Sequence, residues 1–279
     1  MQELMLKPEG PLSGHIDAMI YSLSAGGKQV RPILCMAAAE TLGCRMDDMM
    51  EVPCALECIH TYSLIHDDLP AMDDDELRRG KPTNHMVYGE AGAILAGDGL
   101  LTFAFELLSR PTNNTEISSN DLLRIINVIA VAVGSLGMVG GQALDIDSEE
   151  KDIPFETLRT IHACKTGALI TASVQSGAIL GQADDRQYAA LTDYGRNIGL
   201  AFQIVDDLLN VEGTAEELGK AVGSDADRNK ATYPGFFGVE GTREKAGQAV
   251  ERAITALASF DQKADPLRDL ARYIFERTT

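Results

Sequence analysis

The chain has 279 residues, of which 45% are hydrophobic and 5% aromatic, and it contains no tryptophan. This hydrophobic content is enough for a buried core and excludes an intrinsically disordered chain. The formal net charge of −18 at pH 7 argues against a nucleic-acid-binding protein, because binding to nucleic acid needs a basic surface.

Hydrophobic residues recur at helical spacing along most of the chain. The first such run is Ile16, Met19, Ile20 and Leu23, with Ser13 as a candidate N-cap. A long helix follows around residues 55–65, and further helices are predicted near 90–109, 121–138, 155–180, 186–211, 243–259 and 265–276. The segments 111–119, 145–154 and 213–234 are predicted to be polar loops. No segment shows the two-residue alternation of a strand, so we predict one all-α domain over residues 1–279.

Cysteine usage and targeting signals indicate a cytoplasmic protein. The five cysteines are an odd number without zinc-ligand spacing, so we expect reduced thiols. Residues 1–25 lack a basic segment followed by an apolar one, so no signal peptide is predicted. The most apolar window, 122–141, contains Arg124, Asn127 and several glycines. We therefore predict a buried core helix there and no membrane span.

Two aspartate clusters each follow a long apolar stretch. The first contains Asp67, Asp68 and Asp73, and the second contains Asp206 and Asp207. Asp67 and Asp73 are six residues apart, which is about 240° around a helix at roughly 100° per residue, so they cannot share a helical face. Pro70 is predicted to end the helix and let Asp73 fold back toward Asp67. In the second cluster, Asp206 and Asn210 are four residues apart and share a face directly.

Carboxylates at a helix C-terminus meet the negative end of the helix dipole, so a cation is needed to relieve the repulsion. A hard divalent metal with oxygen ligands is the natural candidate. Arg78 and Arg79 follow the first cluster, and arginines beside a metal site suggest that the metal's other partner is a phosphate.

A second set of cations also indicates anion binding. Lys28 and Arg31 follow Gly26 and Gly27 at a predicted helix start, and helix N-termini favour anions. Lys165, Lys220 and Lys230 add further positive groups to a strongly acidic chain. We expect these cations to bind a ligand with several negative charges.

In their order and spacing these residues resemble the motifs of the trans-isoprenyl diphosphate synthases, and within them the bacterial farnesyl diphosphate synthases. The resemblance covers nearly the whole chain. The matching motifs are Gly26 to Pro32, His60, Asp67 to Asp73 with Arg78 and Arg79, Gly140-Gly141-Gln142, Lys165-Thr166, Gln203 with Asp206 and Asp207, and Gly219-Lys220 through Asp225, Lys230, Thr232 and Tyr233.

The resemblance implies a helical bundle around a deep central cavity, a homodimer, and head-to-tail joining of isopentenyl diphosphate to an allylic diphosphate with release of pyrophosphate. It also implies Mg²⁺ as cofactor, with three ions per site when substrate is bound. The implied metal set is Asp67, Asp68, Asp73, Asp206, Asp207 and Asn210, where Asp68 and Asp207 support the other ligands or act through water. The implied allylic diphosphate site is Arg78, Lys165, Thr166, Gln203, Lys220 and Lys230, and the implied isopentenyl diphosphate site is Lys28, Arg31, His60 and Arg79. The implied catalytic residues are Asp67, Asp68, Asp73, Arg78, Lys165, Asp206, Asp207 and Lys220.

Two departures from the family pattern stand out. Asn210 occupies the place of a third aspartate, and an asparagine brings an oxygen ligand without charge. The segment before Gly26 is also shorter than the family pattern. Tyr62 and Ser63, one helical turn before Asp67, correspond to the chain-length positions of the family, where an aromatic residue goes with a C15 product.

Three alternatives are open at this point. Within the family, a geranylgeranyl diphosphate synthase would differ mainly around Tyr62. An HD-type phosphohydrolase could use His60, His66 and Asp67, but it would leave the second aspartate cluster and the cations unexplained. A non-catalytic subunit is favoured only by Asn210, because the first aspartate cluster is intact. We expect His66 to be packed at the helix end and not to be a ligand.

Overall fold

The computed structural model describes residues 4–45, 49–110, 117–212 and 230–276. Its contacts divide the chain into two compact units. The first unit is Met1–Pro32 with Asp47–Glu116, and the second is Ile33–Met46 with Ile117–Thr279. The prediction of one domain over the whole chain stays a prediction.

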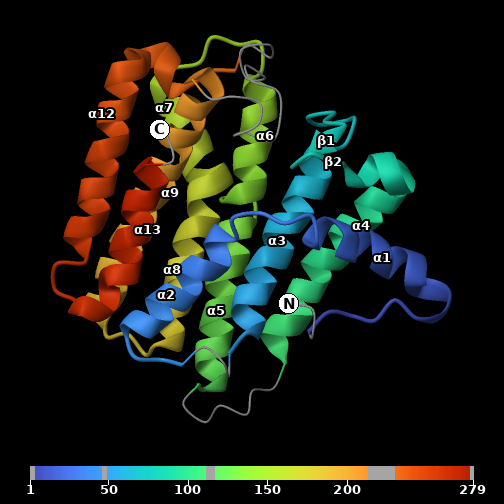
Figure 1. Cartoon of the computed structure of the whole chain (residues 1–279), viewed down its shortest axis with the longest axis horizontal. Helices are drawn as coiled ribbons and strands as arrows, with labels where there is room; N and C mark the ends of the chain where they lie inside the picture. The colour runs from blue at the N-terminus through green and yellow to red at the C-terminus, as the bar shows by residue number, and fades with distance from the viewer. Residues whose placement is uncertain (1–3, 46–48, 111–116, 213–229, 277–279) are drawn as a thin grey trace. The chain divides into compact units, whose positions relative to one another are not determined.

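The first unit is built on two long helices that lie side by side, α3 and α4 (Figure 1). Helix α1 packs against α4. Leu56 and Ile59 of α3 and Leu100 of α4 are fully buried, as the helical spacing of the apolar residues requires. The elements of this unit are η1 (Gly10–Leu12), α1 (Ser13–Leu23), the start of α2 (Val30–Thr41), α3 (Glu51–Asp67), β1 (Leu77–Arg78), β2 (Lys81–Pro82) and α4 (Asn84–Ser109).

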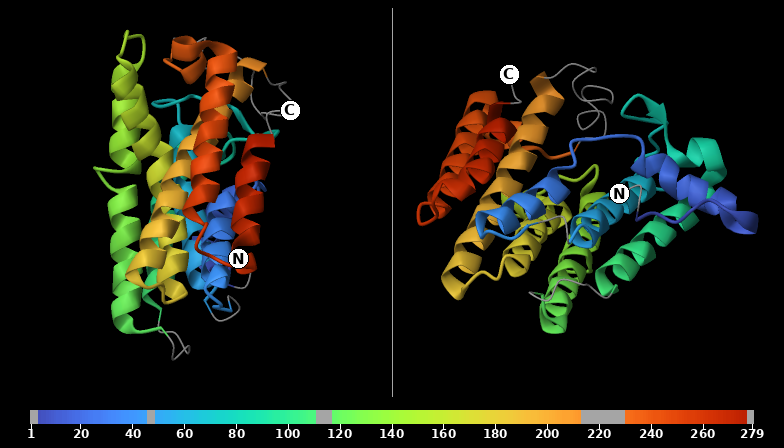
Figure 2. Two further views of the ribbon diagram at one scale, coloured as in Figure 1. Left: turned by 90° about the vertical axis from the view of Figure 1, so that its left-hand side faces the viewer. Right: turned by 60° about the horizontal axis from the view of Figure 1, so that its bottom comes forward.

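In the second unit α12 and α13 both pack against the long helix α9, and α8 packs between α9 and α5 (Figures 1 and 2). The hydroxyl of the buried Tyr194 in α9 donates to the carbonyl of Leu267 in α13 at 2.7 Å, which fixes these two helices. Besides the rest of α2, the elements are α5 (Ser119–Val133), α6 (Met138–Ser148), α7 (Phe155–His162), the π-helical η3 (Ala163–Gly167), α8 (Ala168–Leu180), α9 (Asp185–Glu212), α12 (Tyr233–Ala256), η4 (Gln262–Ala264) and α13 (Asp265–Glu276).

The all-α prediction is confirmed, and α9 and α13 closely match the predicted helices at 186–211 and 265–276. The helix predicted near 121–138 is wrong at its end, because α5 stops at Val133. A Cβ on Gly137 would lie 2.1 Å from the carbonyl oxygen of Ala132, so the close turn there needs glycine. After this turn α6 begins, which places Asp145 on a helix and corrects the predicted loop at 145–154.

Three further expectations are wrong. Ser13 is the first residue of α1 and does not cap it, because the 3₁₀ turn η1 leads directly into the helix. Helix α12 begins at Tyr233, well before residue 243, and Gly238 kinks it with φ 66° and ψ 171°. Strands β1 and β2 form a short antiparallel pair that the sequence pattern does not reveal. Arg79 and Gly80, with φ of 55° and 74°, make its turn.

The most apolar window is only partly buried. Among the described residues, Asn84–Ser109 and Ser119–Ser148 are apolar and long enough to span a membrane by length and composition alone, and 44% and 33% of their windows are buried. Leu123, Val131 and Leu136 are 64%, 59% and 89% exposed. The expectation of a buried core helix at 122–141 is therefore wrong for one of its faces, whereas Ile125 and Ile129 are fully buried.

Candidate active site

The first aspartate cluster forms a turn at the end of α3. The helix ends at Asp67, and the backbone N–H of Asp73 donates to the carbonyl of Asp67 at 2.8 Å. The predicted fold-back after Pro70 is thus confirmed, and it brings the two aspartates to one turn. The ring of His66 rests on Gly97, where a Cβ would lie 2.1 Å from Nε2. His66 is therefore packed at the helix end, as expected.

Arg78 makes the closest contact to this turn. Its Nε donates to both carboxylate oxygens of Asp68, at 2.7 and 2.9 Å, and its Nη2 also reaches Asp68 and Asp75. Asp68 is only 3% exposed. Burial raises the pKa of the Asp68 carboxyl, and Arg78 acts against that rise. Burial works against the charge of Arg78 as well, but Asp68 and Asp75 outweigh it and raise the pKa of the guanidinium. Asp68 holds the arginine in place, and its expected role in supporting metal ligands stays a prediction.

Because of the turn between β1 and β2, the neighbouring residues Arg78 and Arg79 contact different partners. Arg78 lies on β1 and pairs with Asp68, whereas Arg79 occupies the turn with φ 55°. The Arg79 guanidinium lies against Gly27, where a Cβ would come within 2.4 Å of Cζ. Gly27 itself has φ 133°, so no other residue fits here. The structure therefore brings the Gly26–Gly27 segment, which precedes Lys28, to Arg79, and both Lys28 and Arg79 belong to the predicted isopentenyl diphosphate site.

Glu57 was not predicted and lies among the cations of the first unit. It is 5% exposed and sits one helical turn before His60 on α3. Burial raises the pKa of Glu57, while Arg31 and Arg79 lower it. Burial, helped by Arg31, Arg79 and Arg78, lowers the pKa of His60 well below its usual value. His60 is therefore neutral at pH 7, and its spacing from Glu57 is the signal that could have pointed to this residue.

In the second unit, two predicted lysines converge on a residue that the sequence did not single out. Lys165 and Lys230 lie 2.8 and 3.4 Å from the same oxygen, Oδ2 of Asp145. Glu149 contacts Lys230 from the other side at 3.2 Å. The pKa of Asp145 is lowered, since the attraction of the two lysines exceeds the effect of its burial. The third predicted lysine, Lys220, lies outside the described residues.

A chain of hydrogen bonds connects the π-helical segment with α9 and α12. Thr166 Oγ1 donates to Gln203 Oε1 at 2.8 Å, and Gln203 Nε2 donates to Asp207 Oδ1 at 3.2 Å. The backbone N–H of Tyr233 donates to the other Asp207 oxygen at 2.9 Å. Asp207 is 3% exposed, and both of its oxygens accept bonds within the protein. Like Asp68, it is placed to support neighbouring residues. A π-helical turn inside a longer helix is frequent at functional sites.

His162 is a third residue that the sequence did not single out, after Glu57 and Asp145. Its Nε2 is 3.7 Å from Asp207 Oδ1, and its ring stacks on Tyr233 with centroids 5.4 Å apart. Burial lowers the pKa of His162 to about 3, with Asp145 acting against the shift and Lys165 adding to it. The ring is therefore neutral at pH 7. Its position three residues before Lys165 is the only sequence signal for it.

The carboxylates suit a metal that needs few protein ligands. The described residues contain no group of three or more histidines, cysteines, aspartates or glutamates that could hold a metal by itself. Mg²⁺ is usually bound by one or two carboxylates together with water and substrate phosphates, and it prefers oxygen. Asp67, Asp73 and Asp206 offer only oxygen, so they fit Mg²⁺ that arrives with a diphosphate. Asn210 is 4% exposed, and its role as a ligand stays a prediction.

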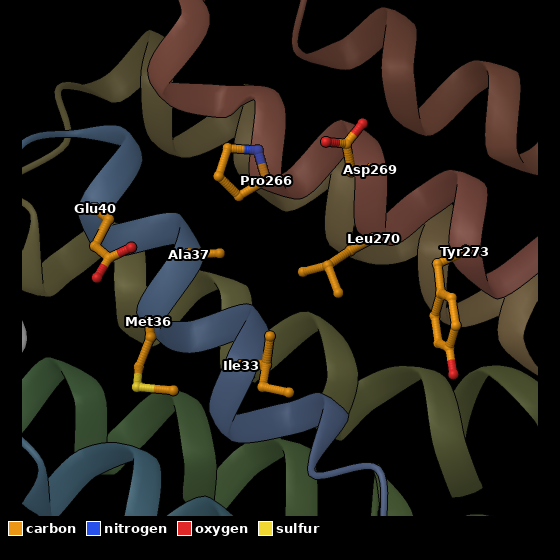
Figure 3. Close-up of a pocket in the computed structure, with 8 residues that line it drawn as sticks. All are labelled: Ile33, Met36, Ala37, Glu40, Pro266, Asp269, Leu270 and Tyr273. Atoms are coloured by element: carbon orange, nitrogen blue, oxygen red, sulfur yellow. The ribbon is translucent and has the colours of Figure 1, made fainter.

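A groove between α2 and α13 contains none of the predicted site residues (Figure 3). Its volume is about 450 Å³. Leu270 extends from α13 toward α2, while Glu40 and Asp269 bring carboxylates to the lining. The lining is Ile33, Met36, Ala37, Glu40, Pro266, Asp269, Leu270 and Tyr273. No part of the site described above involves it.

Carboxylates at helix ends, together with arginine and lysine clusters on an all-α fold, define a helical enzyme that handles diphosphates. A family model described as polyprenyl synthetase matches residues 15–269, which covers parts of both units. The chain belongs to the polyprenyl synthetase family and is a prenyltransferase.

Individual relatives agree with this assignment. The chain is 50% identical to a farnesyl diphosphate synthase of Geobacillus stearothermophilus, over 88% of this chain and 82% of the relative. It is 49% identical to a geranylgeranyl diphosphate synthase of Cyanophora paradoxa, over 97% of this chain and 90% of the relative. A crystal structure of an FPP/GFPP synthase from Zymomonas mobilis matches with a TM-score of 0.87 and 41% identity, covering 98% of this chain and 92% of that one.

Proposed function

We propose that this prenyltransferase joins isopentenyl diphosphate head to tail to dimethylallyl or geranyl diphosphate, releases pyrophosphate, and gives the C15 product farnesyl diphosphate. The observation that carries the proposal is the turn that brings Asp67 and Asp73 together, with Asp68 holding Arg78 beside them. A diphosphate leaving group needs both kinds of partner, because it gains negative charge as its C–O bond breaks.

One group of residues binds the allylic diphosphate, which ionises, and another group binds isopentenyl diphosphate, which does not. Mg²⁺ bound by Asp67, Asp73 and Asp206 would neutralise the leaving diphosphate. Arg78, Lys165 and Lys230 hold that diphosphate, together with Lys220. Thr166 and Gln203 turn polar groups toward the developing cation, and their mutual hydrogen bond of 2.8 Å fixes their orientation.

The second diphosphate must not ionise, so its site needs cations without metal. Lys28, Arg31 and Arg79 supply these cations for isopentenyl diphosphate, and the neutral imidazole of His60 contributes a hydrogen bond. Holding both substrates makes the coupling effectively unimolecular. The proton lost after the new C–C bond forms goes to the released pyrophosphate, so no dedicated base is required.

Tyr62 supports a C15 product. It is 6% exposed on α3, five residues before Asp67, and its ring packs edge-on against His66 with centroids 5.7 Å apart. Ser63 beside it donates to the carbonyl of His60 at 2.8 Å. A bulky, fixed ring one turn from the aspartates limits a chain that grows along α3. We expect Tyr62→Ala to lengthen the product and Ser63→Phe to shorten it.

Product analysis tests the proposal. The purified protein receives isopentenyl diphosphate with dimethylallyl or geranyl diphosphate and Mg²⁺, and the dephosphorylated alcohols are sized. Farnesol as the main product supports the C15 assignment. Geranylgeraniol would overturn the product length and favour the second candidate, a C20 synthase like the Cyanophora paradoxa relative. Absence of condensation with either allylic substrate would overturn the proposed reaction.

The exposed apolar surface of the second unit supports a homodimer. Leu123, Val131, Leu136 and Val139 are each at least half exposed on α5, on α6 and between them. Apolar patches of this kind mark protein interfaces. Analytical ultracentrifugation should give twice the mass of 30.0 kDa, and Leu136→Glu should shift it to the monomer. A wild-type monomer at micromolar concentration would contradict the proposal.

A further inference from the structure

We propose that Asp145 is a positioning residue, which holds Lys165 and Lys230 together at the spacing that the allylic diphosphate requires. The inference rests on the proposed function, because it assigns the role of a residue within the same site. Asp145 follows the Gly140-Gly141-Gln142 motif on α6, and this motif has no role in the proposed reaction.

Gly141 explains how α6 comes to lie so close to the segment that carries Lys165. A Cβ on Gly141 would lie 2.3 Å from the backbone nitrogen of Lys165 and 2.8 Å from the Cβ of Cys164. Contacts below 3.0 Å are not tolerated against backbone atoms, so only glycine allows this approach. The two helices therefore meet at Gly141, with α6 in direct contact with the π-helical turn.

Asp145 follows Gly141 by four residues and lies on the same face of α6. From there its Oδ2 accepts from Lys165 Nζ at 2.8 Å and contacts Lys230 Nζ at 3.4 Å. Glu149 follows after four more residues and contacts Lys230 at 3.2 Å. On this face of α6, Gly141 allows the close contact with the Lys165 backbone. Asp145 and Glu149 then provide the carboxylates that contact the two lysines.

The shared oxygen determines how far apart the two ammonium groups can lie. Because both contact Oδ2 of Asp145, they are no more than about 6 Å from one another, where their mutual repulsion is substantial. Asp145 offsets this repulsion from a partly buried position, since its side chain is 16% exposed, against 34% for Glu149. A lysine on its own is a flexible point charge, so the carboxylate supplies the positioning that the side chain lacks.

Asp145→Asn tests this role, with Asp147→Asn as the matched control. Asp147 lies on the same helix, is 78% exposed and pairs with Lys151 at 3.0 Å. Steady-state kinetics would give KM separately for geranyl diphosphate and isopentenyl diphosphate. For Asp145→Asn we expect KM for geranyl diphosphate to rise at least about tenfold while that for isopentenyl diphosphate stays within about twofold. Asp147→Asn should change neither.

A direct binding measurement separates this inference from the proposed reaction. Isothermal titration calorimetry with inorganic pyrophosphate and Mg²⁺ needs no condensation, so it remains informative if the enzyme makes a different product or none. Weaker pyrophosphate binding by Asp145→Asn, at an unchanged melting temperature, supports the inference. Tighter binding would overturn it, because Asp145 would then compete with the diphosphate for the lysines. An equal rise of both KM values with a lower melting temperature would show a purely structural role and would also overturn it.

The double variant Asp145→Asn/Lys230→Gln gives a further check. If Asp145 acts through the lysines, the loss in the double variant is smaller than the product of the two single losses. Strictly multiplicative losses would contradict a role through Lys230.

Discussion

In the first unit the cation that pairs with the aspartate turn is an arginine, whereas in the second unit the cations that share Asp145 are lysines. Arg78 donates several hydrogen bonds to both carboxylate oxygens of Asp68, and the Arg79 guanidinium packs against Gly27. The two lysines of the second unit converge instead on one oxygen of Asp145. Each unit thus pairs its positive charges with a carboxylate, which is buried in the first unit and partly buried in the second, and the two pairings differ in geometry.

The difference follows from the two side chains. A guanidinium has a rigid fork of donors, so a carboxylate that engages the fork fixes its orientation as well as its position. An ammonium is a compact charge that can rotate, so a single carboxylate oxygen fixes its position alone. Substitutions in the first unit should therefore disturb geometry, and substitutions in the second unit should mainly disturb charge.

The largest expected effect comes from the aspartate turn itself. Asp67→Ala removes an oxygen that we propose as a ligand for Mg²⁺, and we expect kcat/KM to fall by about 10³ or more, because such a metal contributes several kcal/mol to leaving-group stabilisation. Asp74→Asn is the matched control. Asp74 is exposed in the same turn with φ 51°, a conformation that asparagine tolerates. Steady-state assays at saturating Mg²⁺ decide the point, and equal activities of the two variants would rule out a metal role for this turn.

The arginine geometry should be sensitive to a substitution that keeps its charge. Arg78→Lys retains the positive charge but loses the fork that meets Asp68, so we expect kcat/KM for the allylic substrate to fall by roughly 10². Arg110→Lys is the control, since Arg110 pairs with Glu106 at 2.8 Å and lies over the ring of Phe103 at 5.6 Å, away from the proposed site. A loss below about threefold for Arg78→Lys would show that charge alone matters there.

The lysine cluster should tolerate the reverse exchange better. Lys165→Arg keeps the charge beside Asp145, so we expect a loss in kcat/KM of about tenfold or less, caused by the larger head group. The losses in kcat/KM for Lys165→Arg and Arg78→Lys should be measured under the same conditions, so that the two units can be compared directly. If Lys165→Arg proves more damaging than Arg78→Lys, the distinction between geometry and charge fails.

Local spacing predicted the features of the site that depend on neighbouring residues. The separation of Asp67 and Asp73 together with Pro70 was enough to predict the fold-back at the end of α3. The role of Asp145 was not predicted, because its partners lie 20 and 85 residues away in the sequence. In addition, residues 145–154 were predicted to form a loop, whereas α6 continues to Ser148. The start of α6 depends on the close turn at Gly137, which is a backbone contact with the carbonyl of Ala132 and leaves no periodic signal in the sequence.

Each unit also keeps a neutral histidine beside its cations, and the smallest expected effect concerns the one in the second unit. Burial lowers the pKa of His162 to about 3, while Asp145 opposes this shift and Lys165 reinforces it. In the unfolded chain the same imidazole takes up a proton below about pH 6.5. The folded state therefore binds fewer protons, so the stability due to His162 is present above pH 6.5 and is lost as the pH falls toward 3.

The change in the free energy of unfolding with pH tests the state of His162 independently of activity. One such group lowers the free energy of unfolding by at most about 1.4 kcal/mol for each pH unit below its ordinary pKa. His162→Phe preserves the ring that stacks on Tyr233 and removes the titration, so urea unfolding between pH 6.5 and 5 should show a flatter dependence on pH than in the wild type. His15→Phe, which changes an exposed histidine of the first unit, is the matched control for the loss of an imidazole. An identical slope for His162→Phe and the wild type would mean that His162 titrates normally in the fold, and that its contact with Asp207 carries a charge at neutral to mildly acidic pH.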